Sequence, residues 1–167
     1  RRFRCCLVGG TFDRLHAGHR LLLNAASKDA DAVEIHITSD VMAESKSPFV
    51  QSFDDRMDEL HNWAERIRGC KISVHQLNDA YGPARHHSTA DAIVATPETI
   101  GMCAFINEER IKNGLLPLHV IEVMHLDAVE GGIISSSAIR NGHMDREGHP
   151  WLPQNLREST LKMATAL

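Results

Sequence analysis

The 167-residue sequence lacks the features that mark several large classes of protein. It contains no apolar run of about eighteen residues, so a membrane-spanning helix is not expected. Its formal net charge of −4 gives no general attraction to nucleic acid or to an anionic membrane surface. The first residues also lack the apolar core of a secretory signal peptide. We therefore expect a cytoplasmic protein that binds neither nucleic acid nor membranes.

A regular cysteine pattern is also missing from the sequence. The four cysteines form no C-x-x-C pair, and three of them lie in apolar segments, where cysteine usually packs as a small core residue. Neither a disulfide framework nor a zinc site is expected, and we predict no side chains dedicated to a metal. With 43% hydrophobic residues, the chain is long enough for one buried core, so we expect a single domain over residues 1–167.

Short apolar segments alternate with amphipathic ones along most of the chain. This alternation predicts an α/β fold, a doubly wound and mostly parallel five-stranded sheet of Rossmann-like type. Residues 41–52 have mixed polarity and are expected to form a loop, and a polar segment from about residue 143 is expected to precede a closing helix over 152–167. Strands are expected at 4–8, 32–38, 71–77, 91–96 and 118–124, and helices at 17–26, 53–68 and 97–113.

A glycine-containing segment links the first expected strand to the first expected helix. Residues 9–19 read GGTFDRLHAGH. The unpaired backbone N–H groups at the start of a helix suit an anion, above all a phosphate. His16 and His19 are three residues apart, which places both imidazoles on one side of a first helical turn. The segment predicts a phosphate site with proton-bearing donors, although a metal pair or helix-capping histidines would show the same spacing.

Two further groups of polar residues fall at the same predicted edge of the sheet. Lys46 lies in the expected loop after the second strand, and Ser135-Ser136-Ser137 precedes a short helical segment that contains Arg140. Serine hydroxyls and a guanidinium near a helix start suit phosphate oxygens. The simpler alternatives are a serine-rich helix cap and a solvated lysine.

The chain resembles a known superfamily at these motifs. GTFD at 10–13 with HAGH at 16–19, followed far downstream by ISSS at 134–137 and Arg140, resembles the two signatures of the His-x-Gly-His nucleotidyltransferases. Within that superfamily the sequence is similar to phosphopantetheine adenylyltransferases of the archaeal and eukaryotic type. The similarity continues through SDVMA at 39–43 and TPET at 96–99, and it spans about residues 3–145.

The resemblance implies transfer of an adenylyl group from ATP to 4′-phosphopantetheine, with Mg²⁺ bridging the nucleotide phosphates. The products would be dephospho-coenzyme A and pyrophosphate. Two alternatives stay open at this point. One is a cytidylyl- or adenylyltransferase that acts on another phosphoalcohol or on FMN, and the other is a regulatory module that binds a nucleotide without turnover. The oligomeric state is not readable from the sequence.

The resemblance also implies roles for individual residues. Asp13 is expected to shape the loop more than to act as a base, and Arg56 is expected to face either the phosphates or the solvent. The residues implied in catalysis are His19, His16 and Lys46. Those implied in substrate binding are Thr11, Lys46 and Arg56. Those implied in nucleotide binding are Gly10, Thr11, Phe12, His16, His19, Glu98, Ser135, Ser136, Ser137 and Arg140.

Overall fold

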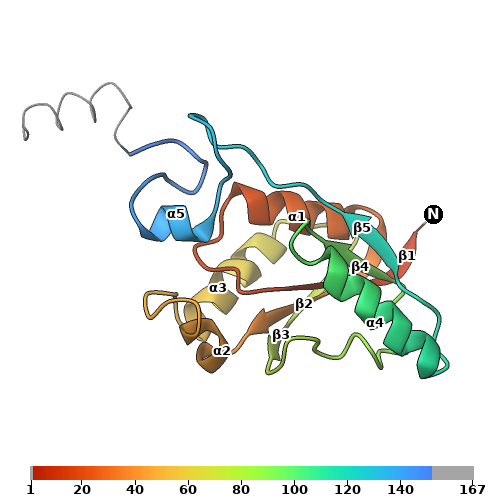
Figure 1. The fold of residues 1–167 in the computed structure, drawn as a ribbon. Coiled ribbons are helices and arrows are strands. Elements are labelled where there is room, and N and C mark those ends of the chain that lie inside the picture. The colour runs from red at the N-terminus through yellow and green to blue at the C-terminus, as the bar shows by residue number, and fades with distance from the viewer. Residues whose placement is uncertain (1, 152–167) are drawn as a thin grey trace, which may run out of the picture.

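A parallel β-sheet runs through the centre of the computed structural model, which describes residues 2–151 (Figure 1). The sheet has five strands in the order β3-β2-β1-β4-β5, and every neighbouring pair is parallel. The predicted doubly wound parallel sheet is therefore confirmed. The strands are β1 (Phe3–Gly10), β2 (Ala30–Thr38), β3 (Lys71–Leu77), β4 (Ala92–Ala95) and β5 (His119–Glu122).

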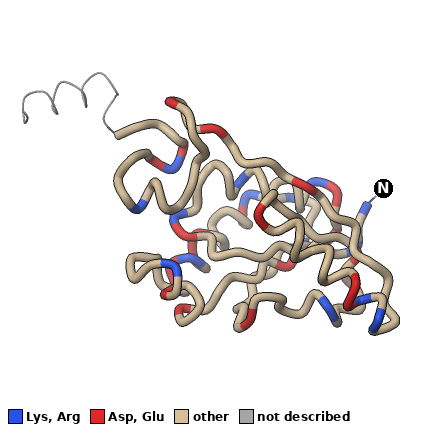
Figure 2. The backbone as a smooth tube through the Cα atoms, in the orientation of Figure 1, with Lys and Arg blue, Asp and Glu red and all other residues tan. Residues whose placement is uncertain are grey.

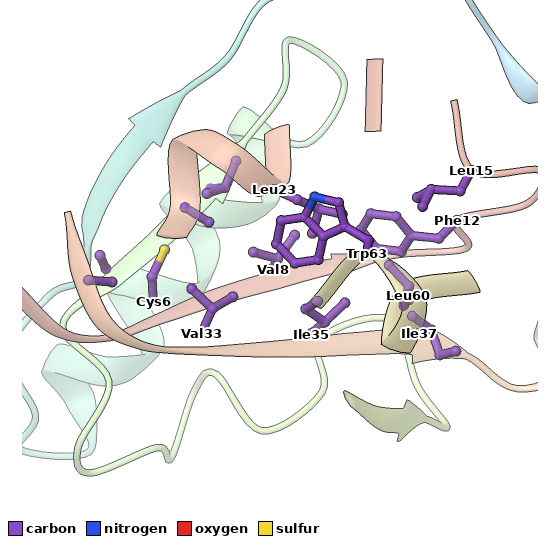
Figure 3. Close-up of a cluster of buried hydrophobic side chains, with 14 of the residues drawn as sticks. Cys6, Val8, Phe12, Leu15, Leu23, Val33, Ile35, Ile37, Leu60 and Trp63 are labelled. Atoms are coloured by element: carbon purple, nitrogen blue, oxygen red, sulfur yellow. The ribbon is translucent and has the colours of Figure 1, made fainter. Parts of the chain in front are cut away.

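Helices cover both faces of this sheet, because alternate residues of each central strand point to opposite sides. Cys6 and Val8 of β1 belong to a core cluster with residues of the helices α1 (Ala17–Lys28) and α3 (Phe53–Ala64), which Figure 3 shows around Trp63. Cys5 of β1 belongs instead to a second cluster with residues of α4 (Ile100–Lys112). The helices are α1 (Ala17–Lys28), α2 (Asp40–Glu44), α3 (Phe53–Ala64), α4 (Ile100–Lys112) and α5 (Ser136–Arg140).

The strand boundaries differ from the predicted ones by at most two residues, whereas three differences in the helices and loops are larger. The expected loop at 41–52 contains most of α2, because the Ser39 hydroxyl caps a short helix by accepting a hydrogen bond from the Met42 amide at 3.3 Å. The helix expected over 53–68 ends at residue 64, and the helix expected from 97 begins at residue 100. The helix begins at residue 100 and not at 97 because the Thr99 hydroxyl accepts a hydrogen bond from the Thr96 amide and closes a turn there. The closing helix expected over 152–167 lies outside the described residues.

Charged residues of both signs are distributed along the whole described chain (Figure 2). This distribution agrees with the small net charge of the sequence. No helix within residues 2–151 combines the length and the apolar character that crossing a bilayer requires.

Arg110 of α4 anchors one of the long connections of the fold. Its side chain is only 2% exposed, although it carries a charge. Its guanidinium donates hydrogen bonds to the carbonyl oxygens of Leu116 at 2.8 Å, Ala84 at 2.8 Å, His87 at 2.8 Å and Ala90 at 3.3 Å. A buried charge is tolerated when its donors are satisfied in this way. Arg110 therefore fixes the segment between β3 and β4 against α4.

Replacing Arg110 by Met should lower the free energy of unfolding by about 3 kcal/mol, because several enclosed carbonyl oxygens lose their donor. Urea unfolding followed by circular dichroism measures this change. Lys112→Met is the matched control, since the Lys112 side chain is 71% exposed on the same helix. Equal stability of the two variants would contradict the anchoring role of Arg110.

Candidate active site

The turn between β1 and α1 has an unusual backbone. Phe12 has a φ of 54° and Arg14 a φ of 47°, a left-handed conformation that non-glycine residues rarely adopt. Such residues persist only where their surroundings enforce them, and they concentrate at functional sites. Here Phe12 is buried, and the Gln51 side chain accepts a hydrogen bond from the Arg14 amide at 2.6 Å. The structure thus holds the glycine-containing segment in one defined shape.

Asp13 joins this turn to the second signature, which lies more than a hundred residues away in sequence. Its carboxylate accepts hydrogen bonds from Arg140 Nη1 at 2.7 Å and from the Gln51 amide at 2.7 Å. The Asp13 carbonyl oxygen accepts a further bond from Ser136 Oγ at 2.7 Å, across 123 sequence positions. Figure 1 shows α5 beside the turn for this reason. The expectation that Asp13 shapes the loop is consistent with this geometry.

The charge of Asp13 is stabilised although the side chain is 1% exposed. Burial opposes ionisation, but hydrogen bonds from Gln51, Arg140 and Arg14 hold the pKa of this carboxyl below its usual range. An ionised carboxylate with these partners is a poor proton acceptor at neutral pH. Asp13 is therefore a structural anion, not a general base.

His16 and His19 cap the start of α1, because the side chain of each residue accepts a hydrogen bond from the backbone amide of the other. The His19 amide donates to His16 Nδ1 at 3.3 Å, and the His16 amide donates to His19 Nδ1 at 3.2 Å. The two rings are stacked, with centroids 3.6 Å apart. Since each Nδ1 accepts a hydrogen bond, a neutral ring carries its proton on Nε2. The capping histidines considered from the sequence are thus present, and the cap leaves both Nε2–H groups as donors.

Burial keeps these imidazoles neutral. It lowers the pKa of His16 to about 4, and it lowers the pKa of His19 well below the usual value, with neighbouring positive charges acting in the same direction. Gly18 allows the close packing, because a Cβ atom at this position would lie 2.9 Å from Cε1 of His16. The HAGH sequence therefore supplies two neutral, fixed hydrogen-bond donors.

A polar cavity of about 310 Å³ lies between the turn, the start of α1 and the segment that leads into α5. Lys46 and Arg140 bring positive charge to its wall. The Ser136 hydroxyl already donates to Asp13, whereas those of Ser135 and Ser137 accept bonds and keep their hydrogens for a ligand. The predicted site residues that line this cavity are Thr11, His16, His19, Lys46, Glu98, Ser135, Ser136, Ser137 and Arg140.

A second cavity of about 250 Å³ adjoins the first one. It lies over the carboxyl-terminal parts of β1, β2 and β4 and is closed by α4 and by residues 80–84. Its lining is mostly apolar, with Leu77 and Met102 among the larger side chains. Thr11 and Lys46 line both cavities. The site therefore has a polar compartment and an apolar one that meet at a hydroxyl and an ammonium group.

This arrangement of signatures and cavities agrees with comparisons to known proteins. A family model described as cytidylyltransferase-like matches residues 7–142. This chain belongs to the cytidylyltransferase-like family. The family resemblance inferred from the two sequence signatures is therefore confirmed.

Individual relatives agree with this assignment. A phosphopantetheine adenylyltransferase of Methanopyrus kandleri is 37% identical over 146 residues, which cover 86% of this chain and 92% of that protein. The protein of the same name from Methanothermobacter thermautotrophicus is 36% identical over 149 residues, covering 89% and 90% of the two chains. A solved structure, of a protein of unknown function from Archaeoglobus fulgidus, matches with a TM-score of 0.62 at 28% identity, covering 72% of this chain and 89% of that one.

The structure does not place Arg56 where it was predicted to contact substrate. Arg56 is fully buried, it lines neither cavity, and it donates to the carbonyl oxygens of Gln51, Thr11 and Thr38 at 2.8–3.0 Å. It also donates to Thr38 Oγ1 at 3.4 Å, and Thr38 Oγ1 donates to Thr11 Oγ1 at 3.1 Å. This relay leaves the Thr11 hydroxyl hydrogen for a ligand. Arg56 is thus a positioning residue.

Phe12 and Gly10 also differ from the predicted pattern of nucleotide contacts. Phe12 lines neither cavity, and its ring packs against the His19 ring with centroids 5.1 Å apart. Gly10 lines the apolar cavity, and a Cβ atom there would lie 3.0 Å from the Phe12 ring. Both residues therefore support the turn instead of facing the polar cavity.

The carboxylates near the polar cavity do not form a metal cage. Asp13 is engaged by two arginines, and the exposed Glu98 lies 3.7 Å from His125. A separate group at the sheet combines Cys5, Glu34 and His87, which are residue types that bind metals. There the Ala90 amide donates to His87 Nδ1 at 3.0 Å, so Nε2 carries the proton and donates to Glu34. We therefore interpret this group as a hydrogen-bond network.

Sequence reasoning missed the apolar cavity altogether. Its walls come from six separated segments, and although the GTFD, SDVMA and TPET motifs contribute residues to them, no sequence pattern marks these segments as one apolar pocket. One signal was present in β2, where Glu34, His36 and Thr38 alternate with apolar residues up to the edge at which ligands bind in this fold.

The neutral state of the two motif histidines can be measured directly. We expect long-range ¹H–¹⁵N spectra to show His16 and His19 as Nε2–H tautomers from pH 8 down to about 5.5, because burial disfavours the charged form. The unfolded chain takes up protons below about pH 6.5, so the stability that the neutral His16 ring contributes is present above that pH and is lost as the pH falls toward 4. Free histidine in the same buffer is the reference. Imidazolium shifts for both residues at pH 6 would contradict this assignment.

Proposed function

We propose that this chain transfers the adenylyl group of ATP to 4′-phosphopantetheine, forming dephospho-coenzyme A and pyrophosphate. The observation that carries this proposal is that Thr11 and Lys46 border both cavities. With a triphosphate in the polar cavity and the apolar chain of a phosphorylated acceptor in the other, the two phosphate groups would meet at these two residues. The curated relatives named phosphopantetheine adenylyltransferase support the same reaction.

The reaction needs alignment more than acid–base chemistry. A phosphate oxygen of the acceptor attacks the α-phosphorus of ATP, and the bond from this phosphorus to the bridging oxygen of pyrophosphate breaks. The acceptor phosphate is already ionised at neutral pH, so no side chain has to remove a proton. The catalytic task is to hold two anions in line and to stabilise the charge on the pentacoordinate phosphorus.

The residues of the polar cavity suit this task. His19 and His16 donate from Nε2 to the α- and β-phosphate oxygens, and these bonds strengthen as charge develops in the transition state. Lys46 offsets the repulsion between the acceptor phosphate and the nucleotide. Ser135, Ser137 and Arg140 hold the outer phosphates, with Arg140 retaining its bond to Asp13.

The apolar cavity suits the arm of the acceptor. The dimethyl-substituted carbon and the methylene groups of 4′-phosphopantetheine gain free energy on burial against Leu77, Met102 and Ile106. The Thr11 hydroxyl, held by Thr38, donates to the phosphate at the entrance. An acceptor without an apolar arm would leave this cavity unfilled, which disfavours small phosphoalcohols.

Mg²⁺ fits the donor set of the polar cavity as an ion bound to the nucleotide. Hydroxyl groups and phosphate oxygens are ligands that Mg²⁺ prefers, and it usually keeps several waters instead of a protein cage. When bound, the ion would neutralise charge on the phosphates and on the departing pyrophosphate.

The cytoplasmic location and the single-domain organisation remain predictions.

A pyrophosphate-release assay tests the proposed reaction. We expect release only when ATP and 4′-phosphopantetheine are both present, since neither phosphate site alone completes the reaction. Replacing ATP by CTP, or the acceptor by phosphocholine, glycerol 3-phosphate or FMN, should lower the rate at least about tenfold, the factor for roughly 1.4 kcal/mol. Faster turnover with any of these would favour the alternative transferase. Nucleotide binding without turnover on any acceptor would favour a regulatory module.

Substitutions of His19 test the assigned donor atom. His19→Ala should lower kcat by about 10²- to 10³-fold, the scale for losing one preorganised transition-state donor. His19→Gln should retain more activity than His19→Asn, because the Gln amide places an N–H near the Nε2 position and the Asn amide does not. His61→Ala, on the exposed side of α3, is the control. A His19→Ala enzyme within twofold of the parent would remove His19 from the mechanism.

A further inference from the structure

An unpaired imidazole lies in the wall of the apolar cavity. His36 of β2 borders this cavity and is 8% exposed. Its Nε2 atom is shielded from water and has no hydrogen-bond partner among the described residues. Buried polar atoms are almost always paired, so a shielded ring nitrogen without a partner calls for a physical reason.

The surroundings of His36 favour the neutral form of the ring. The ring stacks on His75, with centroids 5.0 Å apart. Burial lowers the pKa of His36; the neighbouring His75 and His87 act in the same direction, and Glu34 opposes them. A neutral imidazole always presents one N–H donor and one acceptor nitrogen. The imidazole in the cavity wall therefore carries a hydrogen-bonding nitrogen that the protein leaves unused, and because Nε2 is enclosed in this structure, a ligand reaches it when the ring turns about its Cβ–Cγ bond.

Two of the other hydroxyl groups along this wall, those of Thr38 and Thr99, are already engaged. Thr38 Oγ1 donates to Thr11 and accepts from Arg56, and the Thr99 hydroxyl bonds with the backbone of Thr96. His36 precedes Thr38 by two residues on the same face of β2, which places it about 7 Å farther from the phosphate end of the cavity. A ligand group that pairs with His36 therefore sits inside the cavity, away from the reacting phosphate.

We propose that His36 is a specificity-determining residue that hydrogen-bonds the hydroxyl or the first amide of the acceptor arm. This inference rests on the proposed function. In 4′-phosphopantetheine the secondary hydroxyl and the first amide follow the dimethyl-substituted carbon next to the phosphate ester. With the phosphate at Thr11 and Lys46, an extended arm brings these groups to the depth of His36. The bond distinguishes an amide-bearing acceptor from an alkyl phosphate, because the latter leaves the imidazole unpaired.

Steady-state kinetics of His36→Leu and His36→Gln test the assignment. His36→Leu fills the space without a polar atom and should raise KM for 4′-phosphopantetheine about three- to tenfold, the scale of one neutral hydrogen bond. KM for ATP and kcat should stay within twofold. His36→Gln places an amide nitrogen near the Nε2 position and should restore KM toward the parent value. His75→Leu, on the stacked and exposed partner, is the matched control.

Each result decides between specific recognition and simple packing. An unchanged acceptor KM in His36→Leu, or an equal rise for His36→Leu and His36→Gln, overturns the assignment. Should His36→Leu unfold, His36→Asn, whose shorter amide does not reach the Nε2 position, takes its place in the comparison. Parent enzyme that releases no pyrophosphate overturns the proposed function itself. Parent turnover with unaffected His36 variants overturns only the role of His36.

Discussion

The contact between Asp13 and the second signature is the interaction on which the site depends. Arg140 and Ser136 reach Asp13 from α5 and close the polar cavity against the turn after β1. Without this contact the histidine motif and the serine motif would be two unrelated helix caps. The carboxylate can take this part because its charge is matched by two guanidinium groups and a backbone amide, which offset the cost of its burial.

Two further buried charges, those of Arg56 and Arg110, hold backbone segments in place, while the side chains proposed to contact ligands are neutral or partly exposed. Arg56 and Arg110 are both buried and both satisfy backbone carbonyl oxygens. The former holds the turn and orients Thr11 through Thr38, and the latter holds the segment that closes the apolar cavity. Neutral His16 and His19 then present donors that need no reorganisation when an anion binds. This division suits a reaction that depends on alignment and charge stabilisation.

Much of the fold and of the polar site follows from local patterns in the chain. Apolar segments of β-strand length alternating with helices predicted the parallel sheet, and the spacing of His16 and His19 predicted their shared side. Short elements were harder to predict from the sequence. The helix α2 depends on one serine cap, and the mixed polarity of its segment gives no helical periodicity that would indicate it. Arg56 was misplaced for a related reason: an arginine on an amphipathic helix is usually exposed, and only tertiary packing shows which carbonyl oxygens enclose it.

The sequence by itself determined the fold class, the glycine turn and which side chains are proposed to bind phosphate. These features depend on neighbours in the chain, through backbone sterics, helix capping and side-chain periodicity. Only the tertiary structure decided that Asp13 links the two signatures, that the histidines expose Nε2, and that an apolar cavity with an unpaired His36 adjoins the polar one. Those properties arise where residues from separate strands and helices meet, and the enclosed volume and the matching of donors to acceptors there are set by the packed chain as a whole.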